Sequence, residues 1–458
     1  MDARILDELR RVAGIDGVRA DDASREAAAG DKWFARSVPE VVVFARSSSA
    51  ASGVMKIASR EKIPVTTRGA GYGYVGGCVP VRGGIVLSTA RMDRIKEISA
   101  EDFVAVVEPG VITGRLQSMA RAKGLFYPPD PASLKDCSIG GNIATNAGGP
   151  RCLKYGVTRS YVLGLEVVLA DGSIARVGGR THKNKTGFDL VGLFTGSEGM
   201  LGIVTEATLR LLPSPPARAV LSASFAHVVK AAAAVQSIFA HGFLPSAAEV
   251  ADRFTLEAAR AHAGASGIIP PGDAHVLVEI DGQKDSVAGE SEALDALLRE
   301  RGALVVERAT TEEACERLWG LRRGFSESLK ATGLRKLNED IVVPRGKLVE
   351  LFEFTAQLGR EFGVPVASFG HAGDGNIHVN LMVENPDDPA TKARMEKALD
   401  ALFLGVIAMG GSITGEHGVG LAKKHWWSQA VGPATDALHH RIKRALDPDD
   451  LLNPGKFL

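Results

Sequence analysis

The sequence predicts an α+β protein in two parts, each of which mixes strands with helices. From Val41 onwards, short apolar runs alternate with amphipathic segments, which indicates strands interleaved with helices. The segment PSPPAR (213–218) interrupts this pattern, because closely spaced prolines disfavour helix and sheet alike. Beyond it strand and helix alternate again, which is typical of an α+β domain with helices on one face of a sheet.

The first part is expected to open with an amphipathic helix within residues 1–30. Strands are then expected at VVVFA (41–45), VTTR (65–68), GIVLST (84–89), FVAVVEPG (103–110) and IVTEATLRLLP (203–213), with helices over 50–62 and 113–123. Residues 161–177 predict a hairpin that turns at Asp171-Gly172. These elements describe a strand-rich first half that ends at the proline segment.

The second part is expected to alternate strands and helices. Strands are expected at VLSASF (220–225), SAAEV (246–250), HVLVEI (275–280) and LVVER (304–308), and helices over 227–240, 251–262, 285–301, 312–331 and 388–409. A further amphipathic helix is expected within the tail 435–458, where Asp447-Pro448 ends it.

Composition narrows the class of protein. The 458 residues include 54 Lys plus Arg and 54 Asp plus Glu, so the formal net charge is zero, which argues against a nucleic-acid binder or a binder of acidic membranes. The four cysteines are far apart without a CxxC motif, so a disulfide framework is not expected. Without a signal-like or membrane-spanning apolar run, the expectation is a soluble cytoplasmic protein with no transmembrane segment.

The 52 glycines are clustered, and the first cluster is RGAGYGYVGG (68–77). It satisfies GxGxxG after a strand, but Pro80 and Gly83 follow where a nicotinamide-binding turn would open a helix, so that site is disfavoured. Successive backbone N–H groups without side chains could hold an anion, with Arg68 at the edge to pair with phosphate. A surface hairpin explains the composition equally well.

Two more glycine clusters lie in the same half. SIGGNIATNAGG (138–149) carries almost no charge, which suits the close approach of a planar neutral ring, and TGSEGMLGIVTEATL (195–209) brings Glu198 and Glu206 beside three glycines. Either cluster alone could be an ordinary turn. Three in one half favour a large, extended ligand over three unrelated loops.

Two glycine-bounded segments in the second half carry histidines. GHAGDGNIHVN (370–380) places His371 and His378 around a turn, and in a strand His378 and Asn380 would share a face. GSITGEHGVG (411–420) places Glu416 beside His417. Two imidazoles and one carboxylate match the ligands of a catalytic Zn²⁺ or Mn²⁺, which leaves His417 as an acid or base. Either segment alone would be explained by hydrogen-bonded turn histidines; together they favour a functional site.

Arg322 lies on the helix expected over 312–331, in a stripe beside the core positions. It could clamp a carboxylate in bidentate fashion, although helical spacing alone favours a solvated arginine with its stem packed on the helix.

Several segments together resemble a known family. PVTTRGAGYGYVGG, the run PPDPASLKDCSIGGNIATNAGG with KYGVTRSYVLGLEVVLADG, and GSEGMLGIVTEATLRLLP resemble the flavin-binding half of the vanillyl-alcohol oxidase superfamily. GHAGDGNIHVN, GEHGVG and the terminal LDPDDLLNPGKFL resemble its 2-hydroxy-acid dehydrogenase branch, which includes D-lactate dehydrogenase, D-2-hydroxyglutarate dehydrogenase and the flavin subunit of glycolate oxidase. The resemblance covers residues 38–458.

The resemblance implies a two-part FAD-binding domain of the vanillyl-alcohol oxidase type at 1–214 and an antiparallel-sheet cap domain with helices on one face at 215–425. Residues 426–458 would return to the FAD-binding domain. The positions that match FAD-binding residues are Arg68, Gly69, Ala70, Gly71, Tyr72 and Gly73 at the pyrophosphate, Pro131, Ser133, Ser138, Gly140, Gly141, Asn142, Asn146 and Gly148 along the diphosphate and isoalloxazine, and Gly202 and Ile203 on the adenine side. No histidine lies in these loops, so the FAD is expected to be non-covalent.

The resemblance also implies roles for residues of the second half. His371, His378 and Glu416 match the ligands of a divalent metal, Zn or Mn. His417 matches the catalytic base, Asn380 a substrate-side group and Arg322 the anchor of the substrate carboxylate.

Two positions depart from the family. Tyr72 replaces a Thr or Ser that contacts phosphate in relatives. Asn338 stands where the 2-hydroxyglutarate branch carries Lys, with Lys336 two residues earlier. The second departure favours glycolate or D-lactate over a dicarboxylate substrate.

The expected function is therefore FAD-dependent oxidation of a small 2-hydroxy acid to the 2-oxo acid. Hydride would pass to flavin N5, and the metal would assist deprotonation of the hydroxyl by His417. The alternatives are a D-2-hydroxyglutarate-type dehydrogenase, a zinc hydrolase that holds a nucleotide in its glycine loops, and a non-catalytic flavin subunit of an oxidase complex. A separate electron-accepting or iron–sulfur subunit is the expected partner, and it could hold the protein at the inner membrane; a homodimer stays open.

Overall fold

A computed structural model describes residues 1–263 and 269–458. The chain forms two compact units: unit 1 contains residues 1–148, 156–214 and 416–458, and unit 2 contains residues 149–155 and 215–415. The return to unit 1 begins at position 416, ten residues before the expected 426. The short segment 149–155 joins unit 2 because Arg151 and Lys154 form ion pairs with Glu279 and Asp281 of the unit 2 sheet.

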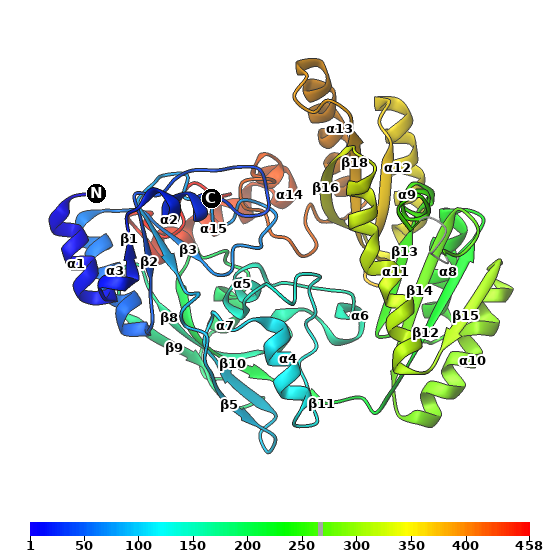
Figure 1. The fold of residues 1–458 in the computed structure, drawn as a ribbon, viewed down its shortest axis with the longest axis horizontal. Coiled ribbons are helices and arrows are strands. Elements are labelled where there is room, and N and C mark those ends of the chain that lie inside the picture. Colours follow the sequence, from blue (N-terminus) through cyan, green and yellow to red (C-terminus); the bar gives the residue numbers. More distant parts are fainter. Residues whose placement is uncertain (264–268) are drawn as a thin grey trace. The chain divides into compact units, whose positions relative to one another are not determined.

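Unit 1 contains a four-stranded sheet in the order β1-β2-β4-β3 (Figure 1). Strands β2 (Val41–Phe44), β4 (Ile85–Ser88) and β3 (Val65–Arg68) are parallel, and β1 (Val18–Arg19) is antiparallel to β2. All three parallel strands were predicted. Helices α1 (Ala3–Ala13) and α3 (Ser48–Glu61) pack together, and their apolar faces join the strands in one core that Leu452 of the returning tail completes.

A second, antiparallel sheet of unit 1 has the order β5-β6-β10-β8-β9. Its strands are β5 (Ile95–Ser99), β6 (Val104–Val107), β10 (Ile203–Arg210), β8 (Val162–Val168) and β9 (Ile174–Gly178). Val168 pairs with Ile174, which confirms the predicted hairpin around Asp171-Gly172.

Shorter elements complete unit 1 around these sheets. They are α2 (Asp22–Ala27), α4 (Thr113–Arg121), β7 (Leu125–Phe126), α5 (Ile139–Thr145), α7 (Leu190–Phe194), β11 (Leu212–Pro213), α14 (Trp427–Val431) and α15 (Pro433–Leu446). The glycine-rich segments fall in the loops between strands and at α5, so the sheets serve as the rigid support of these loops.

Unit 2 is built on a seven-stranded sheet in the order β15-β12-β14-β13-β17-β18-β16, in which every neighbouring pair is antiparallel. The strands are β12 (Ala217–Phe225), β13 (Ala247–Ala251), β14 (Ala274–Gly282), β15 (Val305–Ala309), β16 (Arg335–Val342), β17 (Val366–His371) and β18 (Asn376–Val383). This confirms the α+β class and the antiparallel cap sheet.

Helices cover both faces of this sheet, so the expectation of helices on one face was wrong (Figure 1). The helices are α8 (Val228–Ala240), α9 (Arg253–Ala263), α10 (Lys284–Glu300), α11 (Glu312–Ala331), α12 (Leu348–Phe362) and α13 (Pro389–Ala408), with the short α6 (Cys152–Tyr155). Ala367 packs with α9 and α11, whereas its neighbour Val366 faces Gly359 of α12. Consecutive strand residues point to opposite faces, so α11 and α12 lie on opposite sides.

Candidate active site

The first glycine loop of unit 1 follows β3 and needs its glycines for steric reasons. Gly71 has φ +74°, and a Cβ there would lie 2.2 Å from the Arg68 guanidinium. That guanidinium donates to the carbonyl of Gly30 at 2.6 Å and to Cys78 Sγ at 3.2 Å. Arg68 therefore braces the loop from inside the protein, while its pairing with a phosphate stays a prediction.

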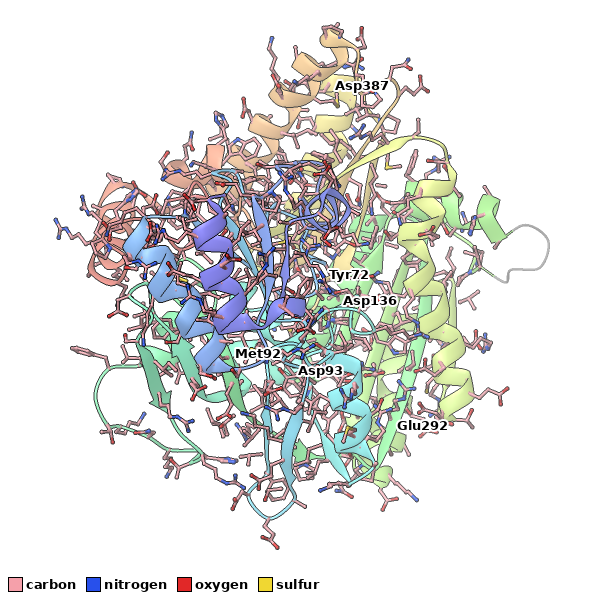
Figure 2. The ribbon with its side chains drawn as sticks, turned by 60° about the vertical axis from the view of Figure 1, so that its left-hand side comes forward. Tyr72, Met92, Asp93, Asp136, Glu292 and Asp387 are labelled. Carbon is pink, nitrogen blue, oxygen red and sulfur yellow. The ribbon has the colours of Figure 1, made fainter. Side chains whose placement is uncertain are left out.

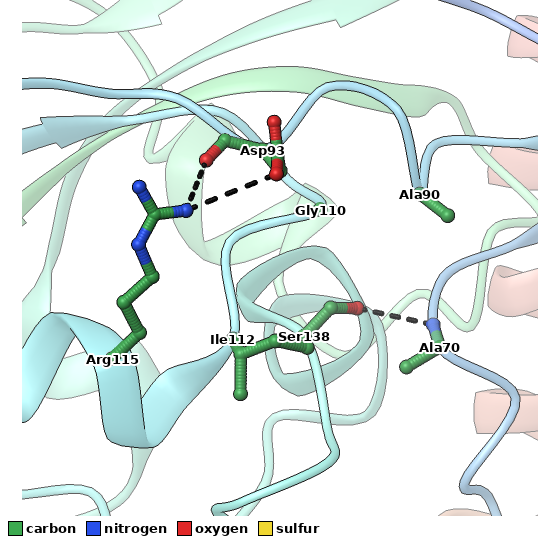
Figure 3. A pocket seen from close by; sticks show the side chains of 7 residues that line it. All are labelled: Ala70, Ala90, Asp93, Gly110, Ile112, Arg115 and Ser138. Carbon is green, nitrogen blue, oxygen red and sulfur yellow. Dashed lines mark hydrogen bonds and ion pairs between the residues drawn. The ribbon is translucent and has the colours of Figure 1, made fainter.

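A cavity of about 160 Å³ opens beside this loop (Figure 3). It is lined by Ala70, Ala90, Asp93, Gly110, Ile112, Arg115 and Ser138. The N–H of Ala70 donates to Ser138 Oγ at 3.3 Å, which joins the first glycine loop to the second. Opposite, Arg115 donates to the Asp93 carbonyl at 3.0 Å. Asp93 and Arg115 were not predicted, since neither stands in a glycine-rich motif.

The backbone of the second glycine cluster, which begins with helix α5, packs closely against its neighbours. A Cβ at Gly140 would lie 2.6 Å from Pro109 Cβ, and one at Gly69 would lie 2.6 Å from Ser138 Oγ. Both glycines are thus needed for close packing beside the cavity. Ala70, Gly110 and Ser138 line that cavity with small side chains or none, which leaves room for a flat cofactor, so the residues present fit a flavin dinucleotide. The predicted contacts of Pro131, Ser133, Gly141, Gly148, Gly202 and Ile203 with the cofactor stay predictions.

Two of the asparagines predicted to contact the cofactor form hydrogen bonds that hold helix α5 and its C-terminal end. Asn142 donates to Thr113 Oγ1 at 2.6 Å. Asn146 adopts a left-handed conformation at φ +53° and accepts the backbone N–H of Arg159 at 2.8 Å. These contacts fix α5 and its C-terminal end, and contact of the two asparagines with a cofactor stays a prediction.

Tyr72, the departure in the first loop, lies beside Asp136 (Figure 2). Burial and the negative charge of Asp136 raise the pKa of the Tyr72 phenol. The ammonium of Lys32 stands 4.4 Å from the centre of the ring. Tyr72 therefore links the first loop to the 131–137 loop, a connection that a Thr or Ser side chain is too short to make in this way.

His417 is held within unit 1 by two contacts on the returning segment. Its imidazole stacks on Tyr74 with ring centroids 5.1 Å apart. Glu198 is buried and accepts the N–H groups of Val419 and Gly420 at 2.7 and 2.9 Å. Burial raises the pKa of Glu198 to about 7, against the lowering effect of these hydrogen bonds. The sequence alone left Glu198 as an ordinary loop residue; the structure makes it the anchor of this segment.

The predicted metal-ligand histidines lie on the β17–β18 hairpin of unit 2. Both imidazoles are buried, and their centroids are 5.5 Å apart. His378 and Asn380 share one face of β18, which confirms the predicted strand. The Asn380 amide donates to the carbonyls of Ala367 and His378 at 2.8 and 3.0 Å. These bonds fix the orientation of the amide, and its Oδ1 has no hydrogen-bond partner among the described residues.

Glu249 of β13 joins His371 to Arg322. One oxygen contacts His371 Nδ1 at 2.6 Å, and the other accepts from Arg322 Nε at 2.5 Å. Burial alone would raise the pKa of Glu249, but the positive charges of His371 and Arg322 and their hydrogen bonds lower it to about 2. Arg322 also stands over the ring of Phe369 at 4.9 Å. It is therefore not the solvated arginine that helical spacing alone favoured.

The backbone just before Glu416 is held by a hydrogen bond to Asp340. Asp340, the register partner of His378, accepts the N–H of Gly415 at 2.8 Å, and Glu416 is the next residue along the chain. Two histidines and a carboxylate are residues that Zn²⁺ and Mn²⁺ bind, and a metal-ligating histidine usually gives its second nitrogen to a carboxylate, as His371 does to Glu249. The donor set therefore fits a divalent metal.

Lys336 brings a cation to the same strand face as Asn338, because the two residues are separated by two positions in β16. Its ammonium donates to Ser326 Oγ at 2.8 Å, one helical turn beyond Arg322. Burial lowers the pKa of Lys336 to about 8. Lys336 thus places a largely buried positive charge on the strand face that it shares with Asn338.

Comparisons with known proteins show the family of the chain. Residues 39–178 match the family model described as "FAD binding domain", and residues 214–457 match "FAD linked oxidases, C-terminal domain". The glycolate oxidase subunit GlcD of Bacillus subtilis is 39% identical over 424 residues, 92% of this chain and 89% of that protein. A D-lactate dehydrogenase of Archaeoglobus fulgidus is 38% identical over 418 residues, 91% of each chain.

Solved structures show the same fold at low identity. 4-Ethylphenol oxidase from Gulosibacter chungangensis superimposes with a TM-score of 0.80 at 21% identity, covering 99% of this chain and 96% of that one. p-Cresol methylhydroxylase gives 0.80 at 20% identity, with the same coverage.

Fold and sequence together define an FAD-dependent oxidoreductase. The chain belongs to the FAD-linked oxidases of the vanillyl-alcohol oxidase superfamily, as the glycine and histidine motifs predicted. Within the described ranges, no helix has the length and apolar character needed to cross a membrane.

Proposed function

We propose that the protein oxidises a small 2-hydroxy acid, glycolate or D-lactate, to the 2-oxo acid. One observation carries the proposal: Glu249 holds the guanidinium of Arg322 and the imidazole of His371 on its two oxygens. A cation that binds carboxylates thus lies next to the histidine hairpin. A 2-hydroxy acid carries its carboxylate and hydroxyl on neighbouring carbons, so both groups can be held at once. The relatives named glycolate oxidase subunit and D-lactate dehydrogenase support the same substrate class.

Arg322 binds the substrate carboxylate in this proposal. Its Nε is engaged by Glu249, so the terminal Nη groups serve the substrate. Paired N–H donors in a rigid plane match the two oxygens of a carboxylate. Asn380 accepts the substrate hydroxyl through the Oδ1 that its two donated hydrogen bonds orient. These two contacts fix the α-carbon and its hydrogen, and such orientation supplies much of the rate of a reaction of this type.

His371, His378 and Glu416 would hold a divalent metal, Zn or Mn. A bound metal supplies Lewis acidity that lowers the pKa of an alcohol. His371 would ligate through Nε2, because Glu249 contacts its Nδ1.

His417 takes the proton of the substrate hydroxyl. FAD, held non-covalently by the glycine loops, supplies the acceptor for the hydride that leaves the α-carbon. Loss of one hydride and one proton converts the alcohol carbon to a carbonyl, so the product is the 2-oxo acid. Tyr74 and Glu198 keep His417 in one place, which a base needs if it is to reach a single proton.

An absorption spectrum of the purified holoenzyme tests the proposal. We expect a yellow protein whose flavin band is bleached by D-lactate or glycolate without oxygen. A colourless protein that hydrolyses its substrate would indicate the zinc-hydrolase alternative. A yellow protein that no 2-hydroxy acid bleaches would indicate the non-catalytic flavin subunit.

Reoxidation of the flavin calls for a second protein in this proposal. The relative from Bacillus subtilis is named as a subunit, so we propose a separate electron-accepting or iron–sulfur partner for this chain in the cytoplasm or at the inner membrane. Co-purification of the tagged full chain from its source would identify that partner, and the mass in solution would show whether the chain alone forms a homodimer.

A further inference from the structure

Glu249 is a buried glutamate whose two carboxylate oxygens each contact another side chain. The residue lies in the centre of β13 with 1% of its surface exposed, and both carboxylate oxygens have a charged or titratable partner. Oε1 contacts His371 Nδ1 at 2.6 Å, and Oε2 accepts from Arg322 Nε at 2.5 Å. One rigid group therefore sets the position of two side chains from different elements, a strand end and a helix.

Each contact has a defined chemical consequence. A carboxylate on Nδ1 keeps that nitrogen protonated, which leaves Nε2 as the ligating nitrogen of His371. The bond to Nε, together with the position of the guanidinium over Phe369, fixes the plane of that group. Both orientations depend on a carboxylate, because an amide at this position could accept from one partner but would present N–H groups to the other.

We propose that Glu249 is the positioning residue that couples metal binding to substrate binding in this protein. It rests on the proposed function, in which His371 is a metal ligand and Arg322 the carboxylate anchor. Glu249 itself touches neither substrate nor cofactor. Loss of its charge would weaken both functions together, although no ligand of either is removed.

The same sheet offers a matched control. Glu279 of β14 is also 1% exposed, and it pairs with Arg151 at 2.7 Å and accepts from Trp319 Nε1 at 2.8 Å. None of these partners belongs to the proposed site. Glu279 also accepts from Arg218 at 3.0 Å. The two glutamates therefore match in burial, in sheet and in pairing with arginine, and only the partners of Glu249 belong to the proposed site.

The experiment compares Glu249→Gln with Glu279→Gln in the full-length holoenzyme. Zn²⁺ and Mn²⁺ affinities are measured by chelator competition, bound FAD by absorption, and KM and kcat with D-lactate and glycolate. For Glu249→Gln we expect metal affinity to fall by about 10–100-fold and KM to rise by roughly tenfold as the Arg322 geometry relaxes, with FAD content unchanged. Glu279→Gln should lower the melting temperature and leave metal affinity and KM as in the wild type.

Two results would overturn the inference. One is an unchanged metal affinity in Glu249→Gln, and the other is an equal loss of metal affinity in Glu249→Gln and Glu279→Gln. If Glu249→Gln does not fold, Glu249→Asp keeps the charge but is too short to reach both partners, and it should show the same paired loss; normal metal affinity and KM would then contradict the coupling.

Failure of the proposed function looks different. A wild-type holoenzyme that oxidises no 2-hydroxy acid would refute that function, whereas a selective loss of metal affinity in Glu249→Gln would still support the link between Glu249 and His371. An active wild type with an unaffected Glu249→Gln variant would refute the inference alone.

Discussion

The ring of Tyr74 stacks on the imidazole of His417, with centroids 5.1 Å apart and ring planes inclined by 24°. An aromatic face of this kind restricts the rotation of the imidazole, so the stacking on Tyr74 holds the proposed base in place.

We expect Tyr74→Ala to lower kcat by about tenfold, since His417 would sample several orientations. Tyr74→Phe keeps the stacked ring and should retain wild-type kcat. His417→Ala should lose roughly 10²–10⁴-fold in kcat, the usual contribution of a general base, and keep its yellow colour and its metal. Normal turnover by His417→Ala in steady-state assays would remove the residue from the role of base.

Replacement of Arg322 tests the substrate anchor. Arg322→Lys keeps the charge but loses the planar pair of donors, so we expect KM for D-lactate to rise by at least about tenfold. Arg323→Lys is the matched control, because Arg323 is exposed and pairs with Glu316 on the same helix. Equal kinetic constants for Arg322→Lys and the wild type would place Arg322 outside the site.

Substrate range is predicted to depend on Lys336. Its pKa of about 8 means that the ammonium is charged below pH 8 and loses its charge above it. The kcat/KM for a 2-hydroxy acid with a second acid group, such as malate, should therefore increase relative to the kcat/KM for glycolate when the pH is below 8.

Lys336→Met should abolish that pH dependence, whereas Lys347→Met, at an exposed position, should preserve it. If the ratio of kcat/KM values changes neither with pH nor with the Lys336→Met substitution, the Lys336 ammonium does not contact the substrate.

Glu198 makes stability depend on pH. Its pKa is about 7 in the folded protein and near 4.5 when unfolded, so between these values the folded state binds the proton more strongly. Stability from this group therefore falls as pH rises from about 4.5 to 7, by roughly 1–3 kcal/mol. Urea unfolding of the wild type and of Glu198→Gln at pH 5 and pH 7 should show this as a difference between the two proteins. A wild type that gains stability over the Gln variant at pH 7 would contradict the burial argument.

A methyl group at Gly140 should prevent flavin binding. A Cβ at Gly140 would lie 2.6 Å from Pro109 Cβ, so Gly140→Ala must displace helix α5. We expect this variant to purify with little or no FAD, measured by absorption. Gly77→Ala places its methyl 4.0 Å from Val75 and should keep the flavin, and equal FAD content in both variants would contradict this prediction.

Much of the fold could be predicted from sequence, because local apolar periodicity reports strands and helices directly. The parallel strands of unit 1, the Asp171-Gly172 hairpin and the shared face of His378 and Asn380 all appeared as expected. Helix α12 (Leu348–Phe362) was not predicted, and the coverage of the cap sheet was assigned to one face. Periodicity shows that a helix has an apolar side but does not show which sheet face that side covers.

Residue order was enough to identify the chemical groups of this protein: glycine-rich segments, two histidines around a turn, a Glu-His pair and an arginine on a helix. Their motifs are local, so residue order alone reveals them. Which of these groups share a partner became visible only in the folded chain. Glu249 stands in a plain apolar strand with no motif, and it lies 73 residues from Arg322 and 122 from His371. Contacts at such separations arise from strand order and helix packing, and a single sequence carries no local signal for them.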